Sequence, residues 1–333
     1  MKPLIDDHGR HISYVRISVT DRCNLRCKYC MPASGVEWIP HDRIMRYEEL
    51  LRIVRICSSR GVGKVRITGG EPLVRKGITD FVRCISSIGG IHDLSLTTNG
   101  VRLSAMAHGL HDAGLHRLNI SLDTLDREKF IRITGIDAFE RVVAGIRKAV
   151  GLGFSPVKIN VVAIRGVNDD EIPAFAELTC KYDVEVRFIE LMPMGCATRY
   201  GDPEIIGSPE IRCIIEEKFG SLEAIEYKNG PAQVFRINGA KGKIGLIGAL
   251  SEHAFCSRCN RIRITANGHL RPCLFAEKEL DLLTPMRQGI SDAELEALIE
   301  EGVRMKKLSH GICAGKPSAS HQGCMAMMNT LGG

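Results

Sequence analysis

Three cysteines that stand close together near the start of the chain form the first group of residues able to do chemistry. They are Cys23, Cys27 and Cys30, in the segment CNLRCKYC that directly follows a β-rich run. A structural zinc ion takes four ligands, usually with cysteines in pairs two to four residues apart. A [4Fe–4S] cluster held by three thiolates keeps one iron open, which indicates chemistry rather than passive electron transfer. The spacing favours a cluster, with zinc as the alternative.

A second cysteine group lies later in the chain and consists of Cys256, Cys259 and Cys273. It flanks two short β-rich runs joined by Asn267-Gly268, a strong hairpin signal that would bring Cys259 and Cys273 together. The cysteine spacing by itself fits an iron–sulfur cluster and a zinc ribbon about equally well. A zinc ribbon would need a fourth ligand from the following residues: His253, Cys313, Cys324 or a histidine of the tail.

Two arginines between these cysteines favour the cluster. Arg261 and Arg263 stand two residues apart in a predicted strand, so both side chains lie on one face. Guanidinium groups aimed at one spot suit a phosphate or another polyanion. The alternative is a basic strand face exposed to solvent.

The composition excludes several classes of protein. The 333 residues include 13 cysteines, too few for a disulfide scaffold of this length, and 45 Lys+Arg against 39 Asp+Glu give a net charge of +6. The apolar runs are far shorter than the ~20 residues of a membrane helix, and residues 1–11 lack the apolar stretch of a secretory signal. We therefore expect a cytoplasmic protein with no membrane or nucleic-acid partner. Four scattered cysteines in predicted helices are expected in the core: Cys57, Cys84, Cys180 and Cys213.

Six β-rich runs that alternate with helical patterns must position these groups. The runs are residues 14–20, 64–68, 93–97, 117–121, 157–163 and 185–190, and the helices that follow them are residues 47–60, 78–88, 102–113, 138–151, 170–182 and 208–219. Repeated βα units predict a parallel sheet with right-handed crossovers. A partial barrel and a doubly wound sheet both fit this pattern, and in both the ligands bind beyond the carboxyl ends of the strands.

The alternation of β-rich runs with helical patterns ends after about residue 220. Short strands are expected at residues 232–237, 243–247, 261–265 and 269–273, followed by helices at residues 281–288 and 292–307. The prediction is an α/β protein: residues 1–225 form a partial (βα)6 TIM-like barrel, and residues 226–333 form a smaller α+β domain with the second cluster.

Two motifs in the first half resemble the radical S-adenosylmethionine (SAM) superfamily. One is the CxxxCxxC triad after the first strand, and the other is Gly69-Gly70-Glu71-Pro72 after the second. In that superfamily the backbone of the GGEP motif holds the amino group of SAM. A Gly-Gly turn also lets the main chain approach a ligand closely, and Glu71 is an acceptor suited to an ammonium group.

Across nearly the whole chain the sequence resembles the GTP 3′,8-cyclases, a radical SAM family of molybdenum-cofactor biosynthesis. The resemblance lies in RISVTDRCNLRCKYCMP, KVRITGGEPLVRKG, LTTNG, LNISLDT, KINVVAIRGVND, EVRFIELMPMG, FCSRCNRIRIT…GHLRPCLF and the terminal Gly332-Gly333. It implies SAM contacts at Tyr29, Gly70, Ser121 and Met192. It implies GTP contacts at Arg16, Arg66, Thr97, Lys158, Arg261, Ile262 and Arg263.

The resemblance also implies the chemistry. Two [4Fe–4S] clusters and SAM would act as cofactors, the first cluster cleaving SAM and the second binding the guanine base. The 5′-deoxyadenosyl radical would remove the ribose 3′ hydrogen of GTP, and the sugar radical would attack guanine C8. Arg263, Gly332 and Gly333 are the predicted catalytic residues, although the tail, HGICAGKPSASHQGC, is less basic than expected. Implied partners are a flavodoxin- or ferredoxin-like donor, cyclic pyranopterin monophosphate synthase for product hand-off, and a second copy in a homodimer.

Two other functions fit parts of the pattern. A peptide-modifying radical SAM maturase would show more cysteines after the barrel, whereas Arg261 and Arg263 point to a nucleotide. A non-catalytic zinc or iron–sulfur protein would not need the GGEP motif or the polar residues at strand ends.

Overall fold

The computed structural model describes residues 2–32, 34–199, 204–226, 230–252 and 255–309. Its strands are β1 (Tyr14–Ser18), β2 (Lys64–Thr68), β3 (Asp93–Thr98), β4 (Arg117–Ser121), β5 (Val157–Ala163), β6 (Val184–Glu190), β7 (Glu223–Ile225), β8 (Gln233–Arg236), β9 (Lys243–Ile247), β10 (Arg261–Ile264), β11 (His269–Arg271) and β12 (Leu280–Asp281). Its α-helices are α1 (Tyr47–Ser59), α2 (Ile78–Ser86), α3 (Leu103–Asp112), α4 (Arg127–Thr134), α5 (Phe139–Gly151), α6 (Ile172–Lys181), α7 (Ser208–Phe219), α8 (Leu283–Arg287) and α9 (Asp292–Arg304). None of the helices in these described ranges is long and apolar enough to cross a membrane.

One twelve-stranded sheet contains all the strands, in the order β12-β11-β10-β1-β2-β3-β4-β5-β6-β9-β8-β7. The first six are parallel and follow chain order, whereas a doubly wound sheet reverses its order at a switch point. The six predicted strands are therefore confirmed, and the doubly wound alternative is not. Strands from the last third extend both edges, with β10 parallel to β1 and β9 parallel to β6, rather than forming a separate sheet.

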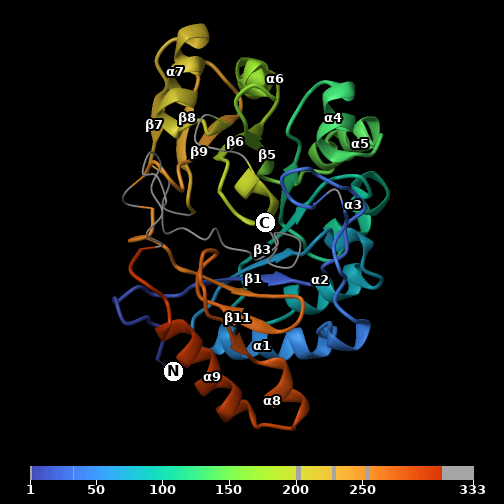
Figure 1. The fold of residues 1–333 in the computed structure, drawn as a ribbon, viewed down its shortest axis with the longest axis vertical. Coiled ribbons are helices and arrows are strands. Elements are labelled where there is room, and N and C mark those ends of the chain that lie inside the picture. Colours follow the sequence, from blue (N-terminus) through green and yellow to red (C-terminus); the bar gives the residue numbers. More distant parts are fainter. Residues whose placement is uncertain (1, 33, 200–203, 227–229, 253–254, 310–333) are drawn as a thin grey trace.

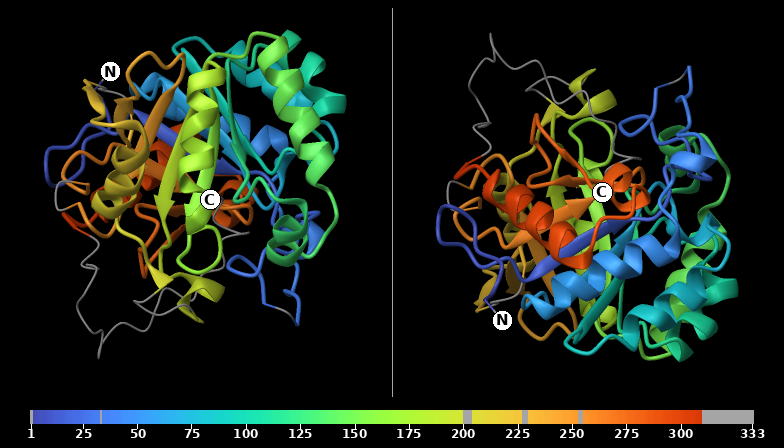
Figure 2. Two further views of the ribbon diagram at one scale, coloured as in Figure 1. Left: turned by 90° about the horizontal axis from the view of Figure 1, so that it is seen from above. Right: turned by 90° about the horizontal axis from the view of Figure 1, so that it is seen from below.

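Side chains alternate strictly between the two faces of the parallel strands. Apolar residues such as Val15, Ile17, Leu118 and Ile120 join the helices in the main hydrophobic core. The helices lie along the outer side of the sheet (Figure 1), and α9 lies beside α1 (Figure 2). Most residues of the opposite face are polar or charged, with Val162 and Ile189 as apolar exceptions. This is unusual because parallel sheets normally bury apolar side chains on both faces. That polar face is the candidate ligand-binding surface.

The structure adds one helix that the sequence analysis missed, α4. It begins at an N-cap, Asp126, whose carboxylate accepts a hydrogen bond from the backbone N–H of Lys129, and it ends at Gly135 with φ of 72°. A positive φ at this position favours glycine. The expectation for the scattered cysteines is corrected in part: Cys57 is buried and Cys180 half-buried, but Cys84 and Cys213 are exposed.

Candidate functional site

The first cysteine loop is held against the end of α4. The backbone N–H groups of Arg26 and Lys28 donate to the carbonyls of Thr134 and Ile133, at 2.8 and 3.0 Å. These bonds use carbonyls at the helix C-terminus that lack partners within the helix. The three cysteines of this loop are all half-buried. The loop is therefore shaped by a neighbouring helix rather than by its own hydrogen bonds alone.

Tyr29, a predicted SAM contact, donates its hydroxyl proton to Asp123 Oδ2 at 2.6 Å. Asp123 follows β4, and its Oδ1 accepts from the backbone N–H of Val162 in β5 at 2.9 Å. Burial and the neighbouring Asp123 raise the pKa of Tyr29 well above its ordinary value, so the phenol stays protonated. Tyr29 and Asp123 line a small cavity together with Ser121, another predicted SAM contact, and Cys27.

The GGEP turn approaches the segment before the first cysteine closely. Gly70 donates its N–H to the carbonyl of Thr20 at 2.6 Å, and a Cβ on Gly70 would lie 2.4 Å from the carbonyl oxygen of Arg22. Glycine is thus required by the packing of the two loops. The Glu71 carboxylate accepts from the backbone N–H groups of Leu73 and Asn99 and from a threonine hydroxyl. Glu71 therefore ties the turn to the end of β3, a structural use that the ammonium-acceptor interpretation did not include.

Three arginines form a row across β10, β1 and β2, because Arg263, Arg16 and Arg66 are register partners on adjacent strands. Burial and the nearby Arg263 hold the pKa of Arg16 well below its ordinary value. Burial and Arg261 lower the pKa of Arg263 to about 10. Like charges brought together in a buried site repel one another, and an anion bound there would relieve that repulsion.

These arginines line a cavity of about 130 Å³ that also reaches the second cysteine group. Its basic lining residues are Arg16, Arg66, Arg187, Arg261, Arg263 and Lys306. In the described part of the chain, no carboxylate lines it. The hydroxyl of Tyr14 and the Asn160 Oδ1 atom, which belong to lining residues, are buried without a hydrogen-bond partner. Buried polar atoms of this kind normally have a partner, so the cavity offers polar groups to a ligand.

The remaining predicted GTP contacts lie at different places. Lys158 is almost fully buried, donates to Glu185 Oε2 at 2.6 Å and lines a small adjoining cavity with Arg66. Thr97 has a buried hydroxyl without a hydrogen-bond partner. Ile262 has its side chain in the hydrophobic core, so only its backbone could face a ligand. Met192, a predicted SAM contact, lines the arginine cavity.

The second cysteine group stands between two cavities. Cys256, Cys259 and Cys273 line the arginine cavity on one side and a cavity of about 480 Å³ on the other. Burial raises the pKa of the Cys259 thiol, but Arg261 and Lys306 outweigh it and bring that pKa to about 6. The Lys306 ammonium group lies nearby, where it donates to the carbonyls of Arg261 and Pro272 at 2.9 and 2.8 Å.

Both cysteine groups have the donor chemistry of an iron–sulfur cluster. Within the described ranges, no three His, Cys, Asp or Glu side chains come together closely enough to hold a metal ion. A zinc ion needs all its ligands within about 2.3 Å of one point, whereas each cysteine of a cluster binds its own iron. Four earlier candidates, His253, Cys313, Cys324 and the Gly332-Gly333 pair, lie outside the described residues.

Comparisons with known proteins show the family of this chain. Residues 17–179 match the radical SAM superfamily, and residues 184–312 match the Molybdenum Cofactor Synthesis C family. The GTP 3′,8-cyclase of Desulforamulus reducens is 49% identical over 310 residues, which cover 92% of this chain and 95% of the relative. The chain belongs to the GTP 3′,8-cyclase family.

Other relatives of this radical SAM family cover almost the whole chain. The GTP 3′,8-cyclase of Thermodesulfovibrio yellowstonii is 44% identical over 98% of this chain and 99% of its own length. Among solved structures, SuiB of Streptococcus suis bound to S-adenosylmethionine is similar in fold, with a TM-score of 0.63, 16% identity, and coverage of 89% of this chain and 69% of SuiB. The enzymes of the family use SAM and two [4Fe–4S] clusters as cofactors, so this chain is a radical SAM enzyme.

Proposed function

We propose that this enzyme converts GTP to (8S)-3′,8-cyclo-7,8-dihydroguanosine 5′-triphosphate, the first step of molybdenum-cofactor biosynthesis. The observation that carries the proposal is the cavity that five arginines and a lysine line, with no carboxylate among its described lining residues. A triphosphate with about four negative charges at neutral pH matches such a cavity. The family names of the relatives supply the identity of the nucleotide.

Each half of the site has its own set of residues in this proposal. We place the first cluster on Cys23, Cys27 and Cys30 and the second on Cys256, Cys259 and Cys273. SAM would be held by Tyr29, Gly70, Ser121 and Met192. GTP would be held by Arg16, Arg66, Thr97, Lys158, Arg261, the backbone of Ile262, and Arg263. When bound, the cofactors would supply the radical that removes the 3′ hydrogen of the ribose.

The residues of the chain itself bind GTP, orient it and shield it from water. The row formed by Arg263, Arg16 and Arg66 neutralises the triphosphate and fixes its position across three strands. Tyr14 and Asn160 offer hydrogen bonds deeper in the cavity, which orient the nucleoside. Closing these groups around the substrate excludes water, which would otherwise quench reactive intermediates.

Several wider predictions belong to the same proposal. The six parallel strands in chain order support a partial (βα)6 barrel over residues 1–225, and residues 226–333 would form the smaller C-terminal domain. A flavodoxin- or ferredoxin-like donor, hand-off of product to cyclic pyranopterin monophosphate synthase, a homodimer and a cytoplasmic location also stay predictions.

An anaerobic turnover experiment tests the function. Reconstituted enzyme with SAM, dithionite and GTP deuterated at ribose C3′ should form the cyclised nucleotide and 5′-deoxyadenosine that carries the deuterium, both measured by mass spectrometry. Formation of 5′-deoxyadenosine without deuterium transfer and without cyclised product would reject GTP as the substrate of the radical.

A further inference from the structure

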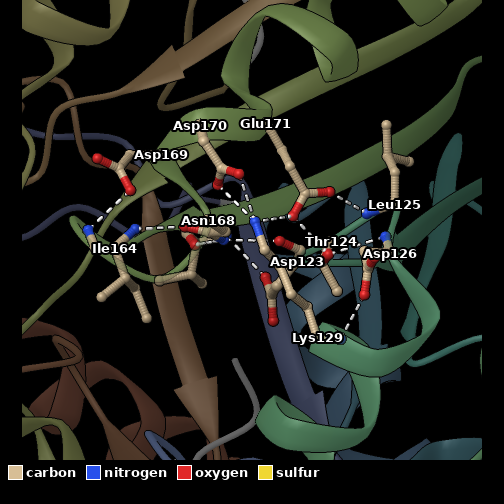
Figure 3. Close-up of polar contacts among 12 residues, drawn as sticks. Asp123, Thr124, Leu125, Asp126, Lys129, Ile164, Asn168, Asp169, Asp170 and Glu171 are labelled. Atoms are coloured by element: carbon tan, nitrogen blue, oxygen red, sulfur yellow. Dashed lines mark hydrogen bonds and ion pairs between the residues drawn. The ribbon is translucent and has the colours of Figure 1, made fainter.

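A short segment between β5 and α6 is hydrogen-bonded to the loop between β4 and α4 (Figure 3). The segment is residues 168–171, and Asn168 at its start is 1% exposed. The Asn168 side-chain amide donates to the carbonyls of Asp123 and Val162, at 2.7 and 2.8 Å, and its Oδ1 accepts from the backbone N–H of Ile164 at 2.8 Å. Both amide hydrogens are therefore used, each on a different strand end.

Glu171 completes these contacts from the same segment. Its carboxylate accepts from the Thr124 hydroxyl at 2.7 Å and from the backbone N–H of Leu125 at 2.6 Å (Figure 3). It also pairs with the Lys129 ammonium group at 3.0 Å, in the first turn of α4. We call Asn168 and Glu171 the clamp.

Two routes lead from the clamp to the first cysteine loop. In the first, Asn168 holds the backbone of Asp123, whose carboxylate accepts from Tyr29 in the loop. In the second, Glu171 holds the start of α4, whose last carbonyls accept from the N–H groups of Arg26 and Lys28. Both routes end within the CxxxCxxC motif, and neither touches the arginine cavity.

We propose that Asn168 and Glu171 are positioning residues for the SAM half of the site: they set the placement of Tyr29 and of the cysteine loop without contacting cofactor or substrate. The proposal rests on the proposed function for the location of SAM. An asparagine is required at position 168 because aspartate, of the same shape, has no hydrogen to donate. Its carboxylate would face the carbonyl oxygens of Asp123 and Val162 and repel them.

Asn168→Asp tests the proposal, with Asp170→Asn as the matched control. Asp170 belongs to the same segment and pairs with Lys129, but its side chain is 67% exposed. The first measurement is hydrogen exchange of the chain without cofactors, in which the amide of Val162, which donates to the Asp123 carboxylate, should lose protection in Asn168→Asp and keep it in Asp170→Asn. The second is binding to the cluster-loaded enzyme, where affinity for SAM should fall about 10- to 100-fold, as outer-shell substitutions do, while affinity for GTP stays within about twofold.

The outcomes separate the alternatives. Unchanged exchange at residue 162, or unchanged SAM affinity, would overturn the proposal. Equal losses of SAM affinity, GTP affinity and melting temperature would show a general structural role and overturn it too. If Asn168→Asp does not fold, Glu171→Gln, which keeps one acceptor oxygen, should show the same selective loss at smaller size. The exchange and SAM-binding results do not depend on cyclised product, so failure of the proposed function would be seen separately.

Discussion

The two cysteine groups lie in opposite electrostatic surroundings. Beside the first, burial and a second thiol, with Asp123 adding to them, raise the pKa of Cys27 well above its ordinary value. Beside the second, Arg261 and Lys306 bring the pKa of Cys259 down to about 6. A carboxylate thus lies beside Cys27 and two cations lie beside Cys259, although both motifs contain three cysteines.

The difference matches the charges of the two proposed ligands. SAM carries a sulfonium and an ammonium group, and Asp123 lines the small cavity beside Cys27. GTP carries a triphosphate, and the arginine row lies beside the second group. Opposite charges attract one another most strongly where water is excluded. This separation would therefore keep SAM beside the first cysteine group and GTP beside the second. Met192, a predicted SAM contact, lines the arginine cavity, so the two proposed halves would meet there.

The largest expected effect comes from removing the first cluster while keeping the second. Anaerobically reconstituted wild-type protein should hold about eight irons, four in each cluster. Cys27→Ala should lose about four of them and all SAM cleavage, because three thiolates are the least that hold such a cluster with one open iron. Iron, sulfide and 5′-deoxyadenosine assays check this.

Zinc bound at the second cysteine group would show that the two groups hold different kinds of metal centre. Stoichiometric zinc at Cys256, Cys259 and Cys273, in protein made and purified without oxygen, would mean that the second group is a structural site. The arginines beside it would then need another explanation.

The second prediction concerns the loss of two cations beside the second cysteine group. Arg261→Ala combined with Arg263→Ala should lower GTP turnover by about two to four orders of magnitude, since each charge-assisted hydrogen bond contributes about 1.5–3 kcal/mol. SAM cleavage without GTP should persist, because neither residue lines the small cavity beside Cys27.

Arg55→Ala, an exposed change on α1, serves as the control for losing an arginine. Iron content and circular dichroism should match wild type in both variants. Equal losses of folding and of turnover in the double variant would show that the arginines build the fold rather than hold the substrate.

The strands and the cysteine groups could be predicted because their signals are local. Alternation in runs such as RLNIS and KINVVA fixes which side chains share a face, and the cysteine spacing is short. The helix α4 was missed because its eight residues are too few to show periodicity, although Asp126 and Gly135 are recognisable boundary signals.

Contacts between distant segments could not be predicted in the same way. Tyr29 and Asp123 are 94 residues apart, and their hydrogen bond depends on how two loops meet at the end of the sheet. Tyr14, Asn160 and Arg187 were missed as cavity residues, yet each is a polar residue inside a parallel strand. That signal was available: a polar residue in a strand expected to be buried on both faces indicates a ligand-lined interior.

A third prediction concerns the end of the chain, which we expect in the GTP-binding half of the site. Gly332-Gly333 lies outside the described residues, and terminal residues are commonly dispensable. We predict instead that diglycine enters the site near GTP and Arg263. Gly333→Ala, or one alanine added after Gly333, should lower cyclised product about tenfold or more, as small misplacements in active sites do, with SAM and GTP binding kept. Wild-type product formation would show the tail to be an ordinary chain end.

The smallest effect concerns Lys158, a predicted GTP contact that is already paired with the carboxylate of Glu185. Burial and Arg187 lower the pKa of Lys158 to about 7, although Glu185 acts in the opposite direction. At about pH 8 the amine is therefore mostly neutral, and a phosphate placed beside it would favour the ammonium form. GTP binding should then take up a fraction of a proton at that pH, and the uptake should vanish at about pH 5, where Lys158 is protonated before and after binding. Calorimetry in two buffers of different ionisation enthalpy measures this. Lys158→Met should abolish the uptake, and an equal uptake in that variant would place Lys158 outside the GTP contacts.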